Sequence, residues 1–383
     1  MNKVKLGDIC TVVSGSTPKS GVAEYWNGNI KWITPAEISS DAYIIYDTER
    51  HITEQAVAKT NLTLLPVGTV LLSSRAPIGK TAITGSEMYC NQGFKNLICS
   101  KHIYNKYLYF FLNSRVDYLN TLGRGATFKE ISKRIVEEVE IPLPTLGEQK
   151  HIVEYFETIQ QLIANRRQAL SILDSLIKSR FIELFGAPND ESLSVERKSI
   201  EDVCDNIYGG GTPSKSHKEY YTGNIPWVTP KDMKTLSIDD SQDHITSEAI
   251  ENSTTKLIPA KSVLMVIRSG ILKHTLPVAI NNVEVTINQD MKAFVPSSIL
   301  TPEYLLHTFK MMEKSILSKV RGVTADNIEF SEFKKRQIVV PSIEMQKQFA
   351  DFVALINKSK FAVQQSIDTL QTLKDKLMQD YFG

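Results

Sequence analysis

The stretch YWNGNIKWITP at residues 25–35 returns almost unchanged at residues 220–230 as YYTGNIPWVTP. The tryptophans of the two stretches, Trp32 and Trp227, are 195 positions apart. The Thr-Pro pairs that precede them, at 17–18 and 212–213, have the same separation. Because neighbouring segments keep a common spacing, the similarity indicates duplication of a whole unit and not a chance match.

The duplication continues along the rest of the chain. HITEQA at 51–56 matches HITSEA at 244–249, and RGAT at 124–127 matches RGVT at 321–324. PTLGEQK at 144–150 matches PSIEMQK at 341–347, and LFG at 184–186 matches YFG at 381–383. The separation drifts between 193 and 197 positions, so short insertions are expected. The 383 residues are therefore one unit of about half that length, written twice.

Each unit begins with a mixed segment and ends with a long helix. Short β-rich runs, such as GTVLLSSR at 68–75 and KSVLMVIR at 261–268, are punctuated by Gly, Pro and Asn. Helical patterns lie among these runs, and together they predict an α+β domain. We divide the chain into a first domain at 1–147, a central helix at 148–185, a second domain at 186–343 and a final helix at 344–383.

The starts of both helices carry recognisable signals. Pro144 and Pro341 end the preceding strand. Thr145 stands three residues before Glu148, which is the spacing of a capping box. Ser342 is the expected cap of the second helix. Gly186 follows the first helix and is expected to stop it.

Both helices have apolar residues at alternating spacings of four and three, which is the pattern of a coiled coil. Arg166 and Arg180 interrupt the first ladder, whereas Lys360 and Lys374 interrupt the second. Each helix is apolar where its counterpart is interrupted, so we expect an antiparallel pair within the chain. The alternative is that each helix packs only on its own domain. The predicted seam contains Ile152, Phe156, Ile159, Ile163, Leu170, Leu173, Ile177, Phe349, Val353, Ile356, Val363, Ile367, Leu370 and Leu377.

Composition excludes few functions. The net charge is +1, which neither requires nor excludes a nucleic-acid partner, because a basic face can coexist with a balanced total. No apolar run approaches the roughly 20 residues of a membrane span, and the N-terminus lacks a signal-peptide core, so a cytoplasmic protein without membrane contact is expected. The four cysteines lack metal-ligand spacing, and Cys10 and Cys204 are expected to be buried as small apolar residues.

The order of these motifs resembles a known family. LGDI at 6–9, GSTPKS at 15–20 and YWNGNIKWITPAEI at 25–38, followed by RGAT and by IPLPTLGEQ at 141–149, are similar to the specificity subunits of type I restriction-modification systems. The resemblance covers essentially the whole chain. It implies two target recognition domains that each read one half of a bipartite, asymmetric double-stranded DNA site, separated by an antiparallel pair of spacer helices.

The resemblance also implies partners. Family members assemble with two modification subunits, which carry S-adenosylmethionine and methylate adenine, and with restriction subunits that translocate and cleave DNA. ATP and Mg are expected in those partners too. This chain would then need no cofactor, metal or catalytic residue of its own, and would dock the modification subunits and set the gap between half-sites.

Candidate DNA contacts are basic residues at loop positions, because arginine can grip guanine and either cation can neutralise phosphate. Several recur in both units at strand ends, beside the Thr-Pro turns or in the Arg-Gly-x-Thr segments. The set is Lys19, Arg75, Lys80, Arg124, Lys215, Arg268, Lys273 and Arg321. The two tryptophans, in apolar strand patterns, are expected to pack in the core, and His51 and His244 to serve in turns or caps.

Two other classes of function remain open. The first is a self-contained DNA methyltransferase or nuclease with an unrecognised motif; IGKT at 78–81 lacks the first glycine of a phosphate-binding loop, and the spacing of Asp326, Glu332 and Lys334 resembles a nuclease motif in one repeat only. The second is a coiled-coil adaptor that binds only proteins. Neither explains the doubled order of motifs.

Overall fold

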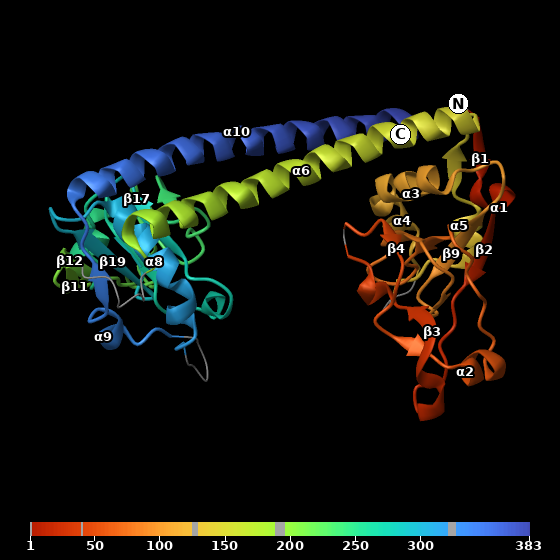
Figure 1. Cartoon of the computed structure of the whole chain (residues 1–383), viewed down its shortest axis with the longest axis horizontal. Helices are drawn as coiled ribbons and strands as arrows, with labels where there is room; N and C mark the ends of the chain where they lie inside the picture. Colours follow the sequence, from red (N-terminus) through yellow and green to blue (C-terminus); the bar gives the residue numbers. More distant parts are fainter. Residues whose placement is uncertain (1, 40, 125–128, 188–195, 321–326) are drawn as a thin grey trace. The chain divides into compact units, whose positions relative to one another are not determined.

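The computed structural model describes residues 2–39, 41–124, 129–187, 196–320 and 327–383. Its fold is α+β with an internal repeat, and the chain separates into two compact units (Figure 1). Unit 1 comprises residues 1–168 and 364–383, and unit 2 comprises residues 169–363. Each unit therefore contains one mixed domain, half of the helix that follows it and half of the other long helix.

Unit 1 is built on a five-stranded sheet in the order β2-β9-β6-β7-β4, with a three-stranded sheet β5-β3-β8 and a two-stranded sheet β1-β10. The strands are β1 (Lys3–Lys5), β2 (Cys10–Ser14), β3 (Trp26–Ile33), β4 (Ile44–Ile45), β5 (His51–Ile52), β6 (Val70–Leu72), β7 (Thr81–Thr84), β8 (Tyr89–Cys90), β9 (Lys95–Cys99) and β10 (Glu140–Pro142). The helices are α1 (Leu6–Ile9), η1 (Ala23–Tyr25), η2 (Pro35–Glu37), α2 (Glu54–Lys59), α3 (Asn105–Ser114), α4 (Val116–Leu122), α5 (Lys133–Glu137) and the first half of α6 (Leu146–Phe185).

Unit 2 repeats this plan with the sheets β12-β19-β16-β17-β14, β15-β13-β18 and β11-β20. The strands are β11 (Arg197–Ser199), β12 (Cys204–Gly209), β13 (Ile225–Val228), β14 (Ser237–Ile238), β15 (His244–Ile245), β16 (Val263–Val266), β17 (Val278–Asn281), β18 (Thr286–Ile287), β19 (Met291–Pro296) and β20 (Gln337–Val339). The helices are η3 (Lys218–Tyr221), α7 (Ser247–Glu251), η4 (Gly270–Lys273), α8 (Pro302–Leu317), α9 (Phe330–Phe333) and the first half of α10 (Ile343–Phe382). The predicted duplication is thus present strand by strand.

The two long helices pair in opposite directions, as the sequence predicts. In unit 1 the start of α6 packs with the end of α10, and the ring of Phe382 lies 5.2 Å from Tyr107 and 5.9 Å from Phe156. In unit 2 the end of α6 packs with the start of α10, and Phe185 lies 4.8 Å from Tyr304 and 5.5 Å from Phe349. Each domain therefore holds the beginning of its own helix and the end of the other one.

All fourteen apolar residues of the predicted seam are buried or partly buried. The basic interruptions take different partners. Lys360 Nζ lies 2.6 Å from Asp174 Oδ1, and Arg166 Nε donates to Ser366 Oγ at 3.3 Å. The guanidinium of Arg180 lies over the Phe352 ring. Burial lowers the pKa of Lys374, and nearby Arg167 adds to the shift.

The helix ends are also as predicted. The backbone N–H and hydroxyl of Thr145 donate to Glu148 Oε2 at 2.8 and 2.7 Å, and Glu148 N–H donates back to Thr145 Oγ1 at 3.3 Å. Ser342 Oγ accepts a longer bond, 3.4 Å, from Met345 N–H. Gly186 ends α6 with φ +76°, a conformation that favours glycine.

A buried glutamine fixes each helix to its domain. Gln149 is fully buried; its Nε2 donates to the carbonyls of His102 and Pro144, and its Oε1 accepts from Tyr104 N–H at 2.8 Å. Gln346 is equally buried and bonds to Ile299, Pro341 and Thr301 in the same manner. Neither residue was singled out for this role from the sequence.

Among the described residues, no helix is both long and apolar enough to cross a bilayer. In the same part of the chain, no three His, Cys, Asp or Glu side chains gather in a way that could hold a metal ion. The four cysteines are free thiols; Cys10 is buried and Cys204 is partly buried.

Replacing Gln149 by Leu removes the partner of three partly buried backbone groups, while the volume of the side chain is nearly kept. We expect the free energy of unfolding of unit 1 to fall by about 1–3 kcal/mol. Urea unfolding, with hydrogen exchange of the Tyr104 amide, measures the loss. Gln365→Leu, on an exposed face of α10, is the matched control and should stay within about 0.5 kcal/mol of the parent. Equal stability of the two variants would contradict this role.

Candidate nucleic-acid interface

The repeated tryptophans are structural. Trp32 and Trp227 are 1% and 7% exposed, which confirms that they pack in the core. Their indole N–H groups donate to the carbonyls of Ser16, at 3.1 Å, and Gly211, at 3.0 Å. Each tryptophan thus anchors the segment around the repeated Thr-Pro pair against its three-stranded sheet.

A carboxylate after each Trp-x-Thr-Pro segment joins two loops. Glu37 Oε1 accepts from Thr34 N–H, and its Oε2 accepts from Glu49 N–H at 2.7 Å. In unit 2, Asp232 accepts from Thr229 N–H at 2.8 Å and from Gln242 N–H at 3.0 Å. The interaction is the same although one side chain is shorter.

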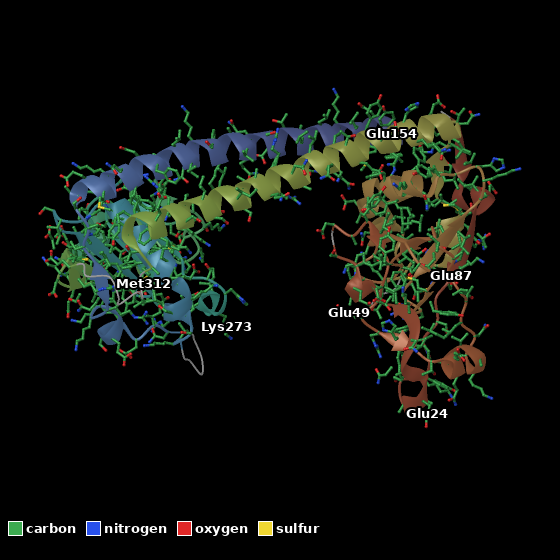
Figure 2. All side chains as sticks on the ribbon, in the orientation of Figure 1. Glu24, Glu49, Glu87, Glu154, Lys273 and Met312 are labelled. Atoms are coloured by element: carbon green, nitrogen blue, oxygen red, sulfur yellow. The ribbon has the colours of Figure 1, made fainter. Side chains whose placement is uncertain are left out.

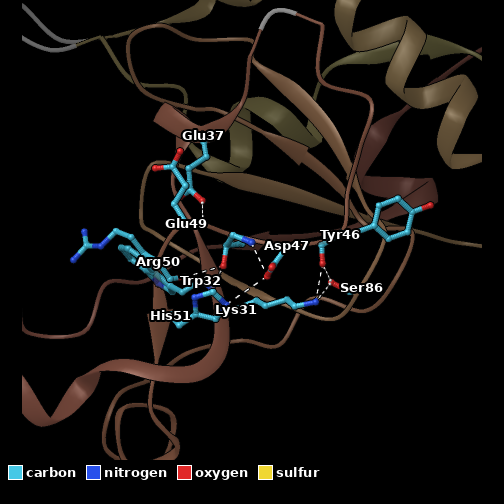
Figure 3. A network of polar contacts seen from close by, with 10 residues as sticks. Lys31, Trp32, Glu37, Tyr46, Asp47, Glu49, Arg50, His51 and Ser86 are labelled. Atoms are coloured by element: carbon cyan, nitrogen blue, oxygen red, sulfur yellow. Dashed lines mark hydrogen bonds and ion pairs between the residues drawn. The ribbon is translucent and has the colours of Figure 1, made fainter.

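The histidines of the HIT segments lie on equivalent short strands of the two units, His51 on β5 and His244 on β15. Figure 3 shows His51 beside Asp47, with Nε2 and Oδ1 3.4 Å apart, and Lys31 reaching the Tyr46 carbonyl and the Ser86 hydroxyl. His244 pairs in the same way with Asp240 at 2.7 Å. The threonines that follow, Thr53 and Thr246, cap α2 and α7. The capping role therefore belongs to the threonines, and the expected turn or capping role of His51 and His244 is wrong because both lie in the short strands β5 and β15.

The Thr-Pro turns are brought against a second repeated feature, the Asn-Gln turns at 91–92 and 288–289. A Cβ at Gly15 would lie 1.8 Å from Asn91 O, and one at Gly210 would lie 1.8 Å from Asn288 O, so only glycine permits this approach. As a result, the Thr17 hydroxyl donates to Gln92 Oε1. The Thr212 hydroxyl donates to Gln289 Oε1 in the same way.

Arg75 lies directly beside this turn in unit 1, because Ser74 N–H donates to Gly93 O at 2.7 Å. Its guanidinium bonds to Glu130 at 2.9 Å, and the buried Lys95 bonds to the other oxygen of Glu130 at 3.2 Å. Burial raises the pKa of Glu130, but Arg75 and Lys95 outweigh it and hold the pKa below its ordinary value. The ion pair with Glu130, which Lys95 also holds, therefore fixes the orientation of the exposed Arg75 guanidinium.

Arg268 has the equivalent place in unit 2 but a different partner. Its Nε and Nη2 both bond to Asp290 Oδ1 at 2.6 Å. The residue bridged to its backbone, Asn327, stands where unit 1 has Glu130. The two arginines are therefore equivalent, whereas the carboxylates that orient them come from different positions.

The remaining candidates lie at several places around these turns. Lys19 and Lys215 are exposed on the loops after the Thr-Pro pairs. Arg124 is exposed, and its backbone pairs with Glu130. Arg321 lies outside the described residues, as does Asp326 of the nuclease-like spacing. Lys334, from the same spacing, forms an ion pair with Glu201 at 2.5 Å.

Lys80 and Lys273, which were predicted in the loops that follow the two arginines, do not occupy equivalent positions of the repeat. Leu72 pairs with Thr81 and Met265 pairs with Val278, so the position equivalent to Lys80 is Pro277. Lys80 is partly buried and donates to Pro35 O at 3.0 Å. Lys273 belongs to η4, which is inserted before β17, and is exposed (Figure 2). The inserted residues explain why the repeat spacing grows at this point.

The surroundings of the shared turns differ strongly between units. In unit 2 a hollow of about 740 Å³ is lined by Lys215, Lys218, Lys231 and Gln289, with Trp227 in its wall. In unit 1 the Arg50 guanidinium lies over the rings of Trp26, at 4.3 Å, and Trp32. The same backbone frame therefore carries different charges.

The comparisons with known proteins identify this arrangement. The family model described as type I restriction modification DNA specificity domain matches residues 1–172 and again residues 193–374. The chain belongs to this family of specificity subunits. The MjaIX specificity subunit of Methanocaldococcus jannaschii is 30% identical over 98% of this chain and 90% of its own length. The EcoR124I/EcoR124II specificity subunit of Escherichia coli is 33% identical over 65% of this chain and 62% of its own length.

Solved structures agree on the fold. A chain from a study of complex assembly and conformational transition of the type I restriction-modification system matches the whole of this specificity subunit and 97% of its own length, with a TM-score of 0.68 and 19% identity. The type I S subunit from M. genitalium matches with a TM-score of 0.56 and 14% identity, covering 96% of that chain. The protein is a DNA-recognition subunit with the predicted α+β repeat.

The sequence indicated part of this interface. The paired arginines were predicted as DNA contacts because they follow equivalent strands, and they stay a prediction. The Thr–Gln pairs were missed, although the dipeptide Asn-Gln at 91–92 and 288–289 recurs 197 positions apart. Glu130, Asp290 and Arg50 leave no comparable signal, because each has a different residue type in the other repeat.

Arg75→Ala should weaken or relax recognition of the DNA segment read by the first domain alone, by about 1–3 kcal/mol if the guanidinium contacts a base. Arg268→Ala should do the same for the second domain. Binding of the assembled complex to duplexes altered in one segment at a time, over a range of salt, measures this. Lys101→Ala is the control, because Lys101 is an exposed lysine two residues after the last residue of β9. An unchanged affinity, specificity and salt slope would remove that arginine from the interface.

Proposed function

We propose that this subunit reads a bipartite, asymmetric DNA sequence, with one half-site for each domain. The supporting observation is that both domains present an arginine and a Thr–Gln pair on the same frame while the side chains around them differ. Equivalent frames allow two similar modes of docking on DNA, whereas unequal side chains contact different bases.

We also propose that the subunit is not itself an enzyme and works in the cytoplasm within a larger complex. Its partners would be two modification subunits and restriction subunits, which would supply S-adenosylmethionine, ATP and Mg. Large apolar side chains on the outward faces of the long helices support docking of proteins there. These include Leu176 and its repeat equivalent Leu373, each 44% exposed, with Leu355 at 63% and Phe361 at 65%.

Footprinting of the assembled complex tests the two-reader proposal. We expect two protected patches on DNA separated by an unprotected gap, because each domain carries its own interface. A single continuous footprint would contradict the proposal. Incubating the pure subunit with labelled S-adenosylmethionine and DNA should give no methyl transfer, whereas transfer without a partner would establish the enzyme alternative.

The paired helices are proposed to set the gap. Arg166 meets Ser366 on one side of the midpoint and Asp174 meets Lys360 on the other, so residues 170 and 363 lie opposite each other. Inserting one heptad after Leu170 and one after Val363 keeps both contacts and lengthens the pair by about 10 Å. We expect a gap about three base pairs longer, with unchanged half-sites.

The added base pairs also rotate one half-site by roughly a third of a DNA turn, so some loss of affinity is expected. Methylome sequencing of cells carrying the variant reads half-sites and gap together. Insertion in α6 alone is the control, since it breaks the seam and should abolish modification. A soluble, assembled double-insertion variant with an unchanged gap would show that the helices do not set the spacing.

A further inference from the structure

We propose that Gln92 and Gln289 each read an adenine, the one base type shared by the two half-sites, while the divergent residues around them read the rest. This inference rests on the proposed function, because it assumes one half-site for each domain. It assigns a specificity role to two residues that are equivalent across the repeat.

Both glutamines are exposed, yet their amides are held in place. The hydroxyls of Thr17 and Thr212 donate to the respective Oε1 atoms, which fixes the direction of each carboxamide plane. The turns themselves are braced by the preceding asparagines: Asn91 Oδ1 accepts from Gly93 N–H at 2.8 Å, and Asn288 Oδ1 accepts from Asp290 N–H at 3.2 Å. An exposed side chain contributes little to stability, so this ordering is better explained by recognition.

The position of the amides suits contact with a base edge. Each follows a strand of the three-stranded sheet, and the residue after it is hydrogen-bonded through its backbone to the segment that carries Arg75, after β6, or Arg268, after β16. In unit 1 Ser74 N–H bonds to Gly93 O, and in unit 2 Arg268 N–H bonds to Asp290 O at 3.2 Å. A cation that attracts phosphate or guanine therefore lies in the segment next to each neutral amide. In unit 2 one N–H of Gln289 faces Asp290 Oδ2 at 3.5 Å, which leaves the second N–H to donate.

The chemistry of a carboxamide selects adenine. Its N–H donates to N7 and its oxygen accepts from the N6 amino group, a pairing that guanine cannot offer because its O6 and N7 are both acceptors. Thr17 and Thr212 occupy one lone pair of the oxygen and leave a second for the amino group.

The neighbouring positions differ at structurally equivalent places. The backbone carbonyls of Arg50 and Asp243 accept from the backbone N–H groups of Trp32 and Trp227, so these residues correspond although their charges are opposite. Gly93 corresponds to Asp290, and Ala36 after Pro35 corresponds to Lys231 after Pro230. A reader that keeps one amide and changes the charges around it suits two half-sites that share one base and differ elsewhere.

The test uses the full chain in its complex with the modification subunits, on duplexes carrying the half-sites found by methylome sequencing. Adenines of one half-site are replaced by 7-deazaadenine, which removes the N7 acceptor and keeps base pairing. We expect the parent complex to lose about tenfold in affinity on either substituted duplex. Gln92→Ala should lose about tenfold on the natural duplex and nothing further when the first half-site is substituted, while still responding to substitution in the second.

Gln289→Ala should show the reciprocal pattern, and Gln55→Ala, an exposed glutamine on α2, should behave as the parent. Equal losses on all duplexes would indicate a phosphate contact and overturn the inference. A Gln92→Ala variant that binds like the parent, or responds to 7-deazaguanine and not to 7-deazaadenine, would overturn it too. A complex that binds both half-sites but ignores these substitutions refutes only this inference, whereas loss of two-patch protection refutes the proposed function as well.

Discussion

The fixed junction between each domain and its long helix is the constraint on which this structure depends. Gln149 and Gln346, whose side chains are fully buried, make it with three hydrogen bonds apiece. A buried amide must have partners for its donors and acceptors. These hydrogen bonds form in only one orientation of the helix relative to the strand and helix that precede it. The direction in which each helix leaves its domain is therefore set chemically at its first turn.

The architecture could be predicted because repeats and heptad spacings are visible along the sequence. Contacts between residues far apart in the sequence could not be predicted in this way. The seam was predicted because apolar residues, such as those that follow Ile152 and Val353, recur at heptad spacing along the sequence. The Thr17–Gln92 contact joins residues far apart in sequence and depends on Gly15 lying against Asn91. Lys80 and Lys273 do not correspond, because the loop that contains η4 is longer in unit 2 than its counterpart in unit 1. Arg50 and Asp290 were missed because their counterparts, Asp243 and Gly93, differ in chemistry.

The two candidate interfaces have the same backbone arrangement but different charged side chains. Glu130 is shared by Arg75 and Lys95, whereas in unit 2 Asp290 takes Arg268, and Lys292, the counterpart of Lys95, lies over the Phe330 ring. The backbone hydrogen bonds around both arginines are nevertheless equivalent. The ionic partners of the two arginines therefore differ between the units while the strands keep the same arrangement. Such a scaffold allows side chains in the loops to vary without loss of the fold.

The packing of Phe382 against Tyr107 and Phe156 also has a consequence for biosynthesis. Residues 364–382 leave the ribosome only after the whole second domain has been made, so the aromatic cluster of the first domain stays incomplete until then. Its apolar rings are exposed for that interval, which favours aggregation or capture by chaperones. A nascent chain cut short before α10 would keep those rings exposed and be open to degradation, so completion of the first domain reports that the second has been translated.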